Sequence, residues 1–531
     1  MNHIELFAGC GGLSLGLETA GFDLLMANEL SPMASETFAW NHLNADLADE
    51  KNMGKVLWIS SQHSRENIKS RLRENPMEAV GIDGKHSDLL SLKPTSAQLK
   101  RSLLVGSIVD LNSMLLNKKN KWLLESIKAL SGNGEIDLIS GGPPCQSFSL
   151  AGLREHSNDR NQLPAEFAKF VGILKPKLAL LENVSGILRA FRVGENKYYA
   201  WYEVAKAFCE EGYVPLCLHL NAKYVGVAQN RPRFVLLAFR SDIFKEFVTK
   251  VTDDRLTEEL NRSREFFESE ELRESYGNLD YIDVVKHPSF YDTEMFSYLR
   301  TLTDGELHTV EDAIDDLRDE KNSIALSEYV NDMNDGLLNY HNHPVDRMVN
   351  HEPRSNNPKV KSRFRIYQVI AQVDNELSKE VIKFMKTEGE SAIKESTLKV
   401  IAAHWLLDLN GNQILKPTPQ FVLEILTNLY TKKQTQRALR ADVPAPAALS
   451  IPDDACHYYE SPETQRTLTV REMARIQSFP DWYQIKSKVT TGGQMRKFEV
   501  PQYTQIGNAV PPLLGLQLGL LCKEILNLVG D

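Results

Sequence analysis

Short apolar runs, each followed by glycine, proline or polar residues, recur along the first 240 residues of the chain. Runs of this length predict buried strands, and stretches with helical spacing lie between several of them. The predicted strands cover residues 3–7, 22–28, 136–140, 176–181, 213–220 and 234–239, with a further strand and turn at 103–111. Strands that alternate with helices in this way predict an α/β domain with a doubly wound sheet.

The first strand runs directly into a glycine-rich turn. Gly9, Gly11 and Gly12 permit a tight turn and close approach of the backbone to a ligand, and a helix that ends at Gly21 follows. Glu29 ends the next apolar run, where such folds place an acid against ribose hydroxyls. The pattern favours a cofactor that contains adenosine, and the absence of a G-K-[ST] motif argues against a triphosphate. A glycine turn without a ligand is the alternative.

A cysteine follows two prolines at the end of the strand within residues 136–152. Pro143 and Pro144 have fixed φ angles and restrict the residues before them, so the backbone that carries Cys145 has few conformations available. A thiol held at the carboxyl end of a strand is a candidate nucleophile, because open α/β sheets bind ligands there. The alternative is an ordinary small buried residue.

Charged residues end or precede the two strands that follow along the same half of the chain. Glu182 ends the strand at 176–181, one βαβ unit beyond Cys145, and begins the run E-N-V. Arg231 and Arg233 lie in a Q-x-R-x-R run just before the strand at 234–239. We expect the acid and the two cations to share one site, although a solvated acid and a surface ion-pair face are the alternatives.

The composition bounds the function. The chain has 531 residues, which predicts two to four domains, and 42% hydrophobic with 25% charged residues is typical of a globular protein. No apolar run approaches the roughly 20 residues of a membrane span, so we expect a cytoplasmic protein without a membrane partner. Six cysteines without C-x-x-C spacing indicate neither disulfides nor a metal site. A net charge of −10 argues against indiscriminate nucleic-acid coating.

The ordered set of motifs resembles the DNA (cytosine-5)-methyltransferase family of bacterial restriction–modification systems. The set comprises the glycine turn, P-P-C-Q, E-N-V, Q-x-R-x-R, and two later segments at 466–483 and 502–515. The resemblance implies a Rossmann-like, S-adenosylmethionine-dependent methyltransferase domain with an inserted smaller target-recognition domain. The implied domains are residues 1–240, with an insertion around 44–102, then 241–464 for target recognition, and 465–531 returning to the first domain through a helix at 513–526.

The resemblance also implies a mechanism for transfer to C5 of cytosine in double-stranded DNA. Cys145 would attack C6 as a thiolate, and Glu182 would contact N3 and the exocyclic amine. Arg233 would contact O2, and Arg231 would support the site electrostatically. The target base would flip out of the duplex, and the loop at 147–161 would close over it.

The same resemblance assigns the residues that bind the cofactor. They are Phe7, Gly9, Gly11, Gly12, Glu29, Ser107, Ile108, Pro144, Asn508 and Val510. Two positions depart from the family pattern: Glu5 and Ser107 each stand where the family commonly has Asp. Asp88 and Leu89 compete with Ser107 and Ile108 for the contact with the adenine.

Basic residues gather in the region that the resemblance assigns to target recognition. The predicted DNA contacts are Arg347, Arg354, Lys359, Lys361, Arg363, Arg365, Lys432 and Lys433. Interleaved Asn and Gln side chains suit contacts to base edges as well as phosphates. A solvated charged surface is the alternative.

We therefore expect a site-specific DNA methyltransferase that protects host DNA beside a cognate restriction endonuclease, without implied contact between the two. A tRNA cytosine-5 methyltransferase of the same family and a catalytically silent DNA-binding homologue are the alternatives. An amino-methyltransferase is disfavoured, because those enzymes need no thiol and Cys145 stands with Glu182 here.

Overall fold

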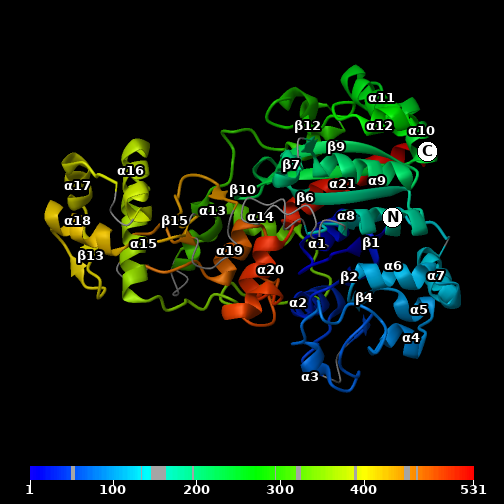
Figure 1. Cartoon of the computed structure of the whole chain (residues 1–531), viewed down its shortest axis with the longest axis horizontal. Coiled ribbons are helices and arrows are strands. Elements are labelled where there is room, and N and C mark those ends of the chain that lie inside the picture. Colours follow the sequence, from blue (N-terminus) through cyan, green and yellow to red (C-terminus); the bar gives the residue numbers. More distant parts are fainter. Residues whose placement is uncertain are drawn as a thin grey trace.

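A nine-stranded sheet forms the centre of the larger of two lobes (Figure 1) in the residues that the computed structural model describes. These residues are 1–49, 54–132, 134–144, 163–193, 196–293, 295–318, 324–387, 391–433, 435–447, 455–461 and 465–530. In spatial order the strands are β12 (Ile282–Asp283), β9 (Tyr213–Asn221), β11 (Pro232–Arg240), β6 (Leu178–Val184), β5 (Leu138–Gly141), β1 (Asn2–Leu6), β2 (Asp23–Glu29), β4 (Ser102–Val105) and β3 (Val56–Trp58). Neighbours from β6 to β3 pair in parallel, whereas β11 is antiparallel to both β6 and β9.

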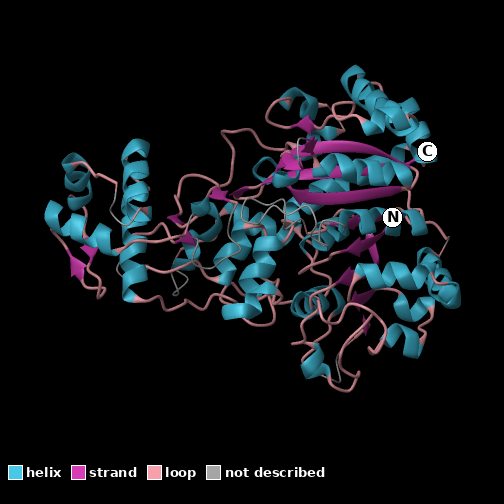
Figure 2. Cartoon of the chain, viewed as in Figure 1, coloured by secondary structure: helices cyan, strands magenta, loops and turns pink. Residues whose placement is uncertain are grey.

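Both faces of the sheet are buried, so successive residues of its central strands are apolar. In β6, Leu178 and Leu180 belong to one core, and Ala179 and Leu181 belong to the other. One face is covered by α6 (Ile108–Leu116), α8 (Leu163–Leu174) and α9 (Ala200–Glu210), and the other by α1 (Gly12–Thr19), α10 (Ser241–Lys250) and α21 (Pro512–Leu528). Figure 2 shows helices packed around the strands. The predicted doubly wound α/β fold is confirmed.

The strand order reverses between β1 and β5. From β1 the chain places β2 and β4 on one side, and it later returns to place β5 and β6 on the other. Residues 7–12 leave the carboxyl end of β1, and residues 142–144 leave the carboxyl end of β5. Open α/β sheets bind ligands at such a switch point, so the two loops that carry the predicted chemistry start at the same place.

The two ends of the chain meet where α21 packs on α1. A Cβ atom on Gly16 would lie within 2.5 Å of backbone atoms of Gly515 and Leu516, so only glycine lets the helices approach this closely. α21 therefore packs against the first helix of the chain. The stretch Gln502–Leu528 is long and apolar enough to cross a membrane, but 67% of its most apolar window is buried inside the protein.

The boundary predicted at residue 241 differs from the structure. β12 pairs with β9 at the edge of the main sheet. Apolar residues of α10, of α11 (Asp254–Glu268) and of the segment 282–299 fill the same core as α21. Because this apolar surface is buried against the sheet, residues 241–299 belong to the larger lobe and not to a separate recognition domain.

The smaller lobe has its own hydrophobic core and lies to the left in Figure 1. It contains α15 (Pro358–Ile370), α16 (Asn375–Lys386), α17 (Glu395–Ala402), α18 (Pro419–Asn428), the pair β13 (Leu406–Leu407) and β14 (Gln413–Ile414), and the pair β15 (Arg437–Ala438) and β17 (Ala455–Cys456). Its core runs from Phe364 to Cys456, so the independent part of the predicted recognition domain starts about 120 residues later than residue 241.

A third core joins the two lobes. It contains α13 (Val310–Ile314), α14 (Glu328–Gly336), α19 (Val470–Ile476) and α20 (Gln502–Asn508). Cys10 and Leu15 of the N-terminal segment are buried in the same core. The glycine turn therefore rests on residues contributed by the last part of the chain.

The predicted insertion extends one edge of the sheet. After α2 (Pro32–Leu43) it adds β3, α3 (Ile68–Arg71), α4 (Asp88–Leu92) and α5 (Ser96–Leu99). The remaining elements are α7 (Lys121–Lys128), α12 (Glu270–Glu274), the pair β7 (Phe191–Val193) and β8 (Asn196–Tyr198), and the pair β10 (Gln229–Asn230) and β16 (Ala445–Pro446).

Candidate active site

A turn with left-handed backbone conformations follows β1. The φ angles are 54° at Phe7, 57° at Gly9 and 92° at Gly11. Glycine adopts such angles without strain, whereas phenylalanine does so rarely. Gly12 starts α1 so close to Val510 that a Cβ atom would lie 2.2 Å from the Val510 carbonyl oxygen. Five of the residues predicted to bind the cofactor therefore lie together at the switch point.

Glu29 fixes this turn from the end of β2. One carboxylate oxygen accepts the N–H of Gly9 at 2.8 Å, and the other accepts the N–H of Ser31 at 2.7 Å. Burial raises the pKa of the Glu29 carboxyl above its ordinary value, although both N–H donors lower it. Each oxygen keeps a second lone pair, so the carboxylate can also accept a hydroxyl group of a sugar.

Ser107 and Ile108 lie at the same edge of the sheet, directly after β4. The N–H of Gly106 donates to the carbonyl of Glu29 at 2.9 Å, which ties the end of β4 to the end of β2. The Ser107 hydroxyl accepts the N–H of Val109 at 3.2 Å and caps α6, and Ile108 is buried. This position supports the predicted contact of these residues with the adenine.

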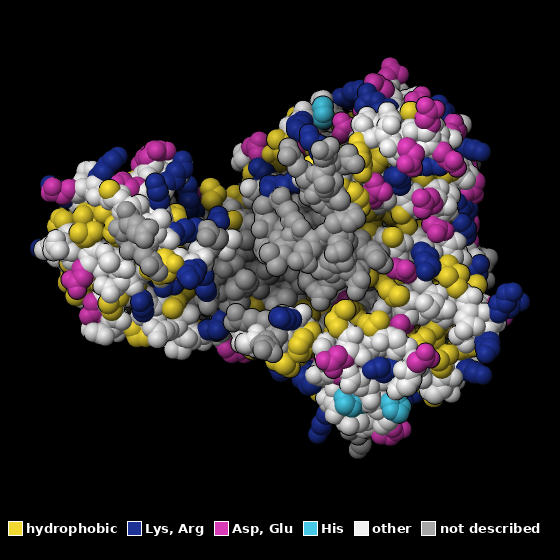
Figure 3. All heavy atoms as spheres, in the orientation of Figure 1, with side chains coloured by type: hydrophobic (Ala, Val, Ile, Leu, Met, Phe, Trp, Pro, Cys, Tyr) yellow, Lys and Arg dark blue, Asp and Glu magenta, His cyan; other side chains and the backbone are white. Residues whose placement is uncertain are grey.

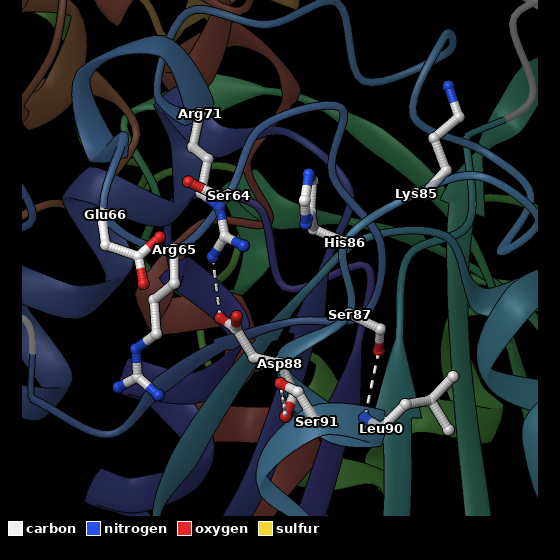
Figure 4. Close-up of a pocket in the computed structure, with 10 residues that line it drawn as sticks. All are labelled: Ser64, Arg65, Glu66, Arg71, Lys85, His86, Ser87, Asp88, Leu90 and Ser91. Atoms are coloured by element: carbon white, nitrogen blue, oxygen red, sulfur yellow. Dashed lines mark hydrogen bonds and ion pairs between the residues drawn. The ribbon is translucent and has the colours of Figure 1, made fainter.

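The competing residues, Asp88 and Leu89, are occupied elsewhere. Arg71 donates to Asp88 at 2.8 Å, and the N–H of Trp58 donates to the same oxygen at 3.0 Å. Figure 4 shows the pair of Arg71 and Asp88 among the residues that line a pocket of about 490 Å³ within the insertion. Leu89 is fully buried. Both residues therefore hold the insertion together, which leaves Ser107 and Ile108 as the better-placed pair.

The loop that leaves β5 is held by the neighbouring strand. The side-chain amide of Asn183 donates to the carbonyl of Pro143 at 3.0 Å, and Pro144 is exposed. A Cβ atom on Gly142 would lie 3.1 Å from Oε2 of Glu182. Cys145 and the predicted closing loop at 147–161 lie outside the described residues.

Glu182 and Arg233 form a nearly buried ion pair beside this loop. Nε of Arg233 lies 2.6 Å from Oε1 of Glu182, and their side chains are 8% and 9% exposed. Burial lowers the pKa of the Arg233 guanidinium, and Glu182 opposes that shift. Since Arg233 engages Oε1, Oε2 is the oxygen that faces Gly142. The pair thus presents one carboxylate oxygen toward the loop that continues into Cys145.

Arg231 binds backbone and not the carboxylate. Its guanidinium donates to the carbonyls of Gly507 at 2.8 Å and Ala509 at 2.9 Å. These two residues flank Asn508, which is exposed, and precede Val510, which is largely buried. Arg231 therefore fixes the C-terminal segment that carries two of the predicted cofactor residues.

The chain matches the model of the C-5 cytosine-specific DNA methylase family over residues 1–59 and 117–523. It belongs to this family. Type II methyltransferase M.DdeI of Desulfomicrobium norvegicum is 26% identical over 100% of this chain and 91% of the relative. Type II methyltransferase M.AgeI of Thalassovita gelatinovora is 26% identical over 99% of this chain and 100% of the relative. The solved structure of Schizosaccharomyces pombe Dnmt2 methyltransferase shares 14% identity over 99% of both chains, with a TM-score of 0.40.

As a member of the C-5 cytosine-specific DNA methylase family, the protein is a DNA cytosine-5 methyltransferase. The predicted resemblance is thus confirmed, and the family is one of S-adenosylmethionine-dependent enzymes. Residues 60–116, which the family model leaves unmatched, overlap the predicted insertion at 44–102. Within the described ranges, no group of three or more His, Cys, Asp or Glu side chains is arranged to hold a metal ion.

Four of the basic residues predicted to contact DNA lie at the surface of the methylase's smaller lobe. Lys359 and Lys432 are exposed, and Lys361 and Lys433 are half-buried. Figure 3 shows Lys and Arg side chains gathered on this lobe along the side that faces the larger lobe. The placement suits contacts to phosphates of a duplex lying between the lobes.

The predicted arginines are more strongly engaged with the protein itself. Arg365 is fully buried, donates to the carbonyl of Trp405 at 2.9 Å and pairs with Glu460 at 3.0 Å. The prediction of a DNA contact does not fit this position, and Arg365 instead holds the core of the smaller lobe. Arg363 donates to the carbonyl of Leu429 at 3.2 Å and is half-buried.

Arg347 and Arg354 lie where the smaller lobe joins the rest of the protein. Arg347 pairs with Asp316 at 2.9 Å, and the Arg354 guanidinium lies 5.8 Å from the centre of the Tyr503 ring. Arg347 contacts the segment just after α13, and Arg354 contacts α20 near the end of the chain, so these two arginines have structural partners in addition to any DNA phosphate.

Glu5 gives the active-site region a pH-dependent stability. Burial raises the pKa of the Glu5 carboxyl to about 8, and the Ser14 hydroxyl donates to it. At pH values between the ordinary pKa of a glutamate and about 8, the Glu5 carboxyl is protonated in the folded protein and ionised in the unfolded chain. The free energy of unfolding should therefore fall by about 1.4 kcal/mol per pH unit from this group as pH rises.

Replacing Glu5 with Gln should remove this component, because the amide does not titrate. Urea unfolding measures the free energy of unfolding of wild type and of Glu5→Gln. The difference between the two proteins in this free energy should change by roughly 2–3 kcal/mol between pH 5.5 and pH 7.5. Glu265→Gln, at an exposed position of α11, serves as the control and should leave the pH dependence unchanged. An equal pH dependence of Glu5→Gln and wild type would contradict the assignment.

Proposed function

We propose that this methyltransferase transfers a methyl group from S-adenosylmethionine to C5 of a flipped cytosine through a covalent adduct of Cys145. The observation that carries the proposal is the ion pair of Glu182 and Arg233, 2.6 Å apart, beside the loop that leads to Cys145. Addition of a thiolate to a pyrimidine ring requires an oriented acid that can protonate the ring, and Glu182 supplies an oriented carboxyl group.

The chemistry assigns a role to each residue. Carbon 5 of cytosine is a poor nucleophile until the Cys145 thiolate adds to C6. Glu182 holds a proton at N3 and keeps the ring neutral during that addition, while Arg233 fixes the carboxylate and contacts O2. Bound S-adenosylmethionine supplies the methyl group. Loss of the C5 proton then expels Cys145 and restores the aromatic ring.

The residues at the switch point fit the proposed cofactor. The left-handed turn brings backbone close to a ligand, the Glu29 carboxylate keeps free lone pairs for ribose hydroxyls, and Ser107 with Ile108 lies at the neighbouring strand end. Asn508 and Val510 approach from the C-terminal segment that Arg231 holds. These groups would bind and orient the cofactor beside the loop after β5.

The proposed substrate is double-stranded DNA with a specific site. A cytosine inside a stacked duplex cannot reach a thiol, so the base must leave the stack. The smaller lobe supplies exposed lysines for phosphate contacts, and we propose that it selects the sequence. By analogy with relatives named type II methyltransferases, the enzyme would protect DNA in the bacterial cytoplasm from a cognate restriction endonuclease.

Replacing Cys145 with Ser should abolish methyl transfer while DNA affinity stays within about twofold, because a hydroxyl at neutral pH does not add to C6. The measurement is incorporation of labelled methyl into a plasmid, with binding followed by gel shift. DNA that carries 5-fluorocytosine at the target should trap an adduct with wild type and none with Cys145→Ser. An adduct at another residue, or turnover by the variant, would refute the mechanism.

Replacing Lys359 and Lys432 together with Ala should weaken DNA binding and flatten its salt dependence. Each lost phosphate contact should reduce the slope of log K against log salt by about 0.9. Fluorescence anisotropy at several salt concentrations measures this slope. Lys245→Ala, an exposed position on α10 of the larger lobe, is the control, and an equal slope for all three proteins would place the DNA surface elsewhere.

A further inference from the structure

A connected set of buried polar side chains lies directly beneath the glycine turn. Glu18 of α1 accepts from Nδ1 of His42 of α2 at 2.7 Å, and Nε2 of His42 lies 3.0 Å from the hydroxyl of Tyr483. The three residues are each no more than 2% exposed. Arg101 completes the set from the insertion side, 2.8 Å from the other oxygen of Glu18.

The set ends on two backbone carbonyls of the turn. The Tyr483 hydroxyl donates to the carbonyl of Cys10, and Nε2 of His42 lies 3.2 Å from the carbonyl of Gly11. A Cβ atom on Gly11 would lie 2.3 Å from Nε2 of His42 and 2.7 Å from the Tyr483 oxygen. Glycine at position 11 is thus needed both for its φ angle of 92° and for the approach of these two groups.

The hydrogen-bond partners define how the set contacts the turn. Tyr483 has one hydroxyl proton, which it gives to Cys10. Both ring nitrogens of His42 then face acceptors, the Glu18 carboxylate on one side and the Gly11 carbonyl on the other. Phe38 stacks on the His42 ring at 4.5 Å and fixes its plane.

Glu18 lies between His42 and Arg101. Burial raises the pKa of its carboxyl, but the hydrogen bond from His42 and the charges of His42 and Arg101 lower it by more, so the pKa lies below its ordinary value. A buried carboxylate that is bound on both oxygens has little freedom to move. The side chains beneath the turn are therefore fixed by mutual charge as well as by packing.

We propose that Glu18, His42 and Tyr483 are positioning residues for the methyl donor. Their contacts to the carbonyls of Cys10 and Gly11 hold the turn in the left-handed conformation that receives the cofactor. This inference rests on the proposed use of S-adenosylmethionine at the turn. It assigns a function to side chains from α1, α2 and the segment after α19 that need not touch the cofactor themselves.

The test removes one hydroxyl. In the full-length protein, Tyr483→Phe should weaken S-adenosylmethionine binding about fivefold to tenfold in calorimetric titration, because one hydrogen bond to the turn is lost. The KM for the cofactor should rise by the same factor, with kcat within about twofold and DNA affinity unchanged. His42→Ala should weaken binding at least as much, and His42→Gln, which can still donate to Gly11, should recover part of the loss.

Tyr213→Phe is the matched control. Its hydroxyl is also buried and also donates to a backbone carbonyl, that of Pro176 at 2.7 Å, but it lies at the amino end of β9, on the opposite edge of the sheet. It should lower thermal stability like Tyr483→Phe and leave cofactor affinity unchanged. If wild type binds S-adenosylmethionine and both Tyr483→Phe and His42→Ala bind it with the same affinity, the positioning role is overturned. Failure of wild type to bind overturns the proposed cofactor and this inference together.

Discussion

The close packing of α21 on α1 is the contact on which the rest of the structure depends. The helices touch at Gly16 and Gly515: a Cβ atom on Gly16 would lie 2.3 Å from the backbone nitrogen of Leu516, and one on Gly515 would lie 3.1 Å from the Leu13 carbonyl oxygen. This contact brings the C-terminal end of the chain to the switch point of a sheet that the N-terminal end begins. The segment from Gln502 to Val510 can then lie against the glycine turn, and one site is built from both ends of the chain.

Polar side chains that bind backbone atoms complete the site. Glu29 accepts from Gly9, Asn183 donates to Pro143, and Arg231 donates to Gly507 and Ala509. The first two contacts fix the loop of one strand from a neighbouring strand, and the third fixes the C-terminal segment. Because buried hydrogen bonds to backbone are costly to break, the loops keep their positions relative to Glu182.

The fold could be predicted because buried strands in a parallel sheet are continuous apolar runs, and their ends are marked by glycine and proline. Glu29 is the last residue of β2, Ser107 lies just after β4, and Glu182 lies two residues before the end of β6. Charge patterns were less informative. A basic residue looks the same in sequence whether it faces solvent, as Lys359 does, or is enclosed, as Arg365 is.

Long-range contacts account for what sequence reasoning missed. The boundary at residue 241 differs from the structure because α11 is rich in acidic residues, which made it look like a solvent-exposed helix in the sequence. Its apolar residues nevertheless pack on the sheet. The set of Glu18 and His42 gave no local signal, since their partner Tyr483 is more than 400 residues away. Only the fold shows that these three segments meet beneath one turn.

The central claim is that the enzyme methylates carbon 5 of cytosine and not an exocyclic nitrogen. Mass spectrometry of nucleosides from a plasmid treated with the purified enzyme and labelled S-adenosylmethionine tests it most directly. We expect 5-methyl-2′-deoxycytidine as the only labelled nucleoside. Labelled N4-methylcytosine or N6-methyladenine in its place would contradict it.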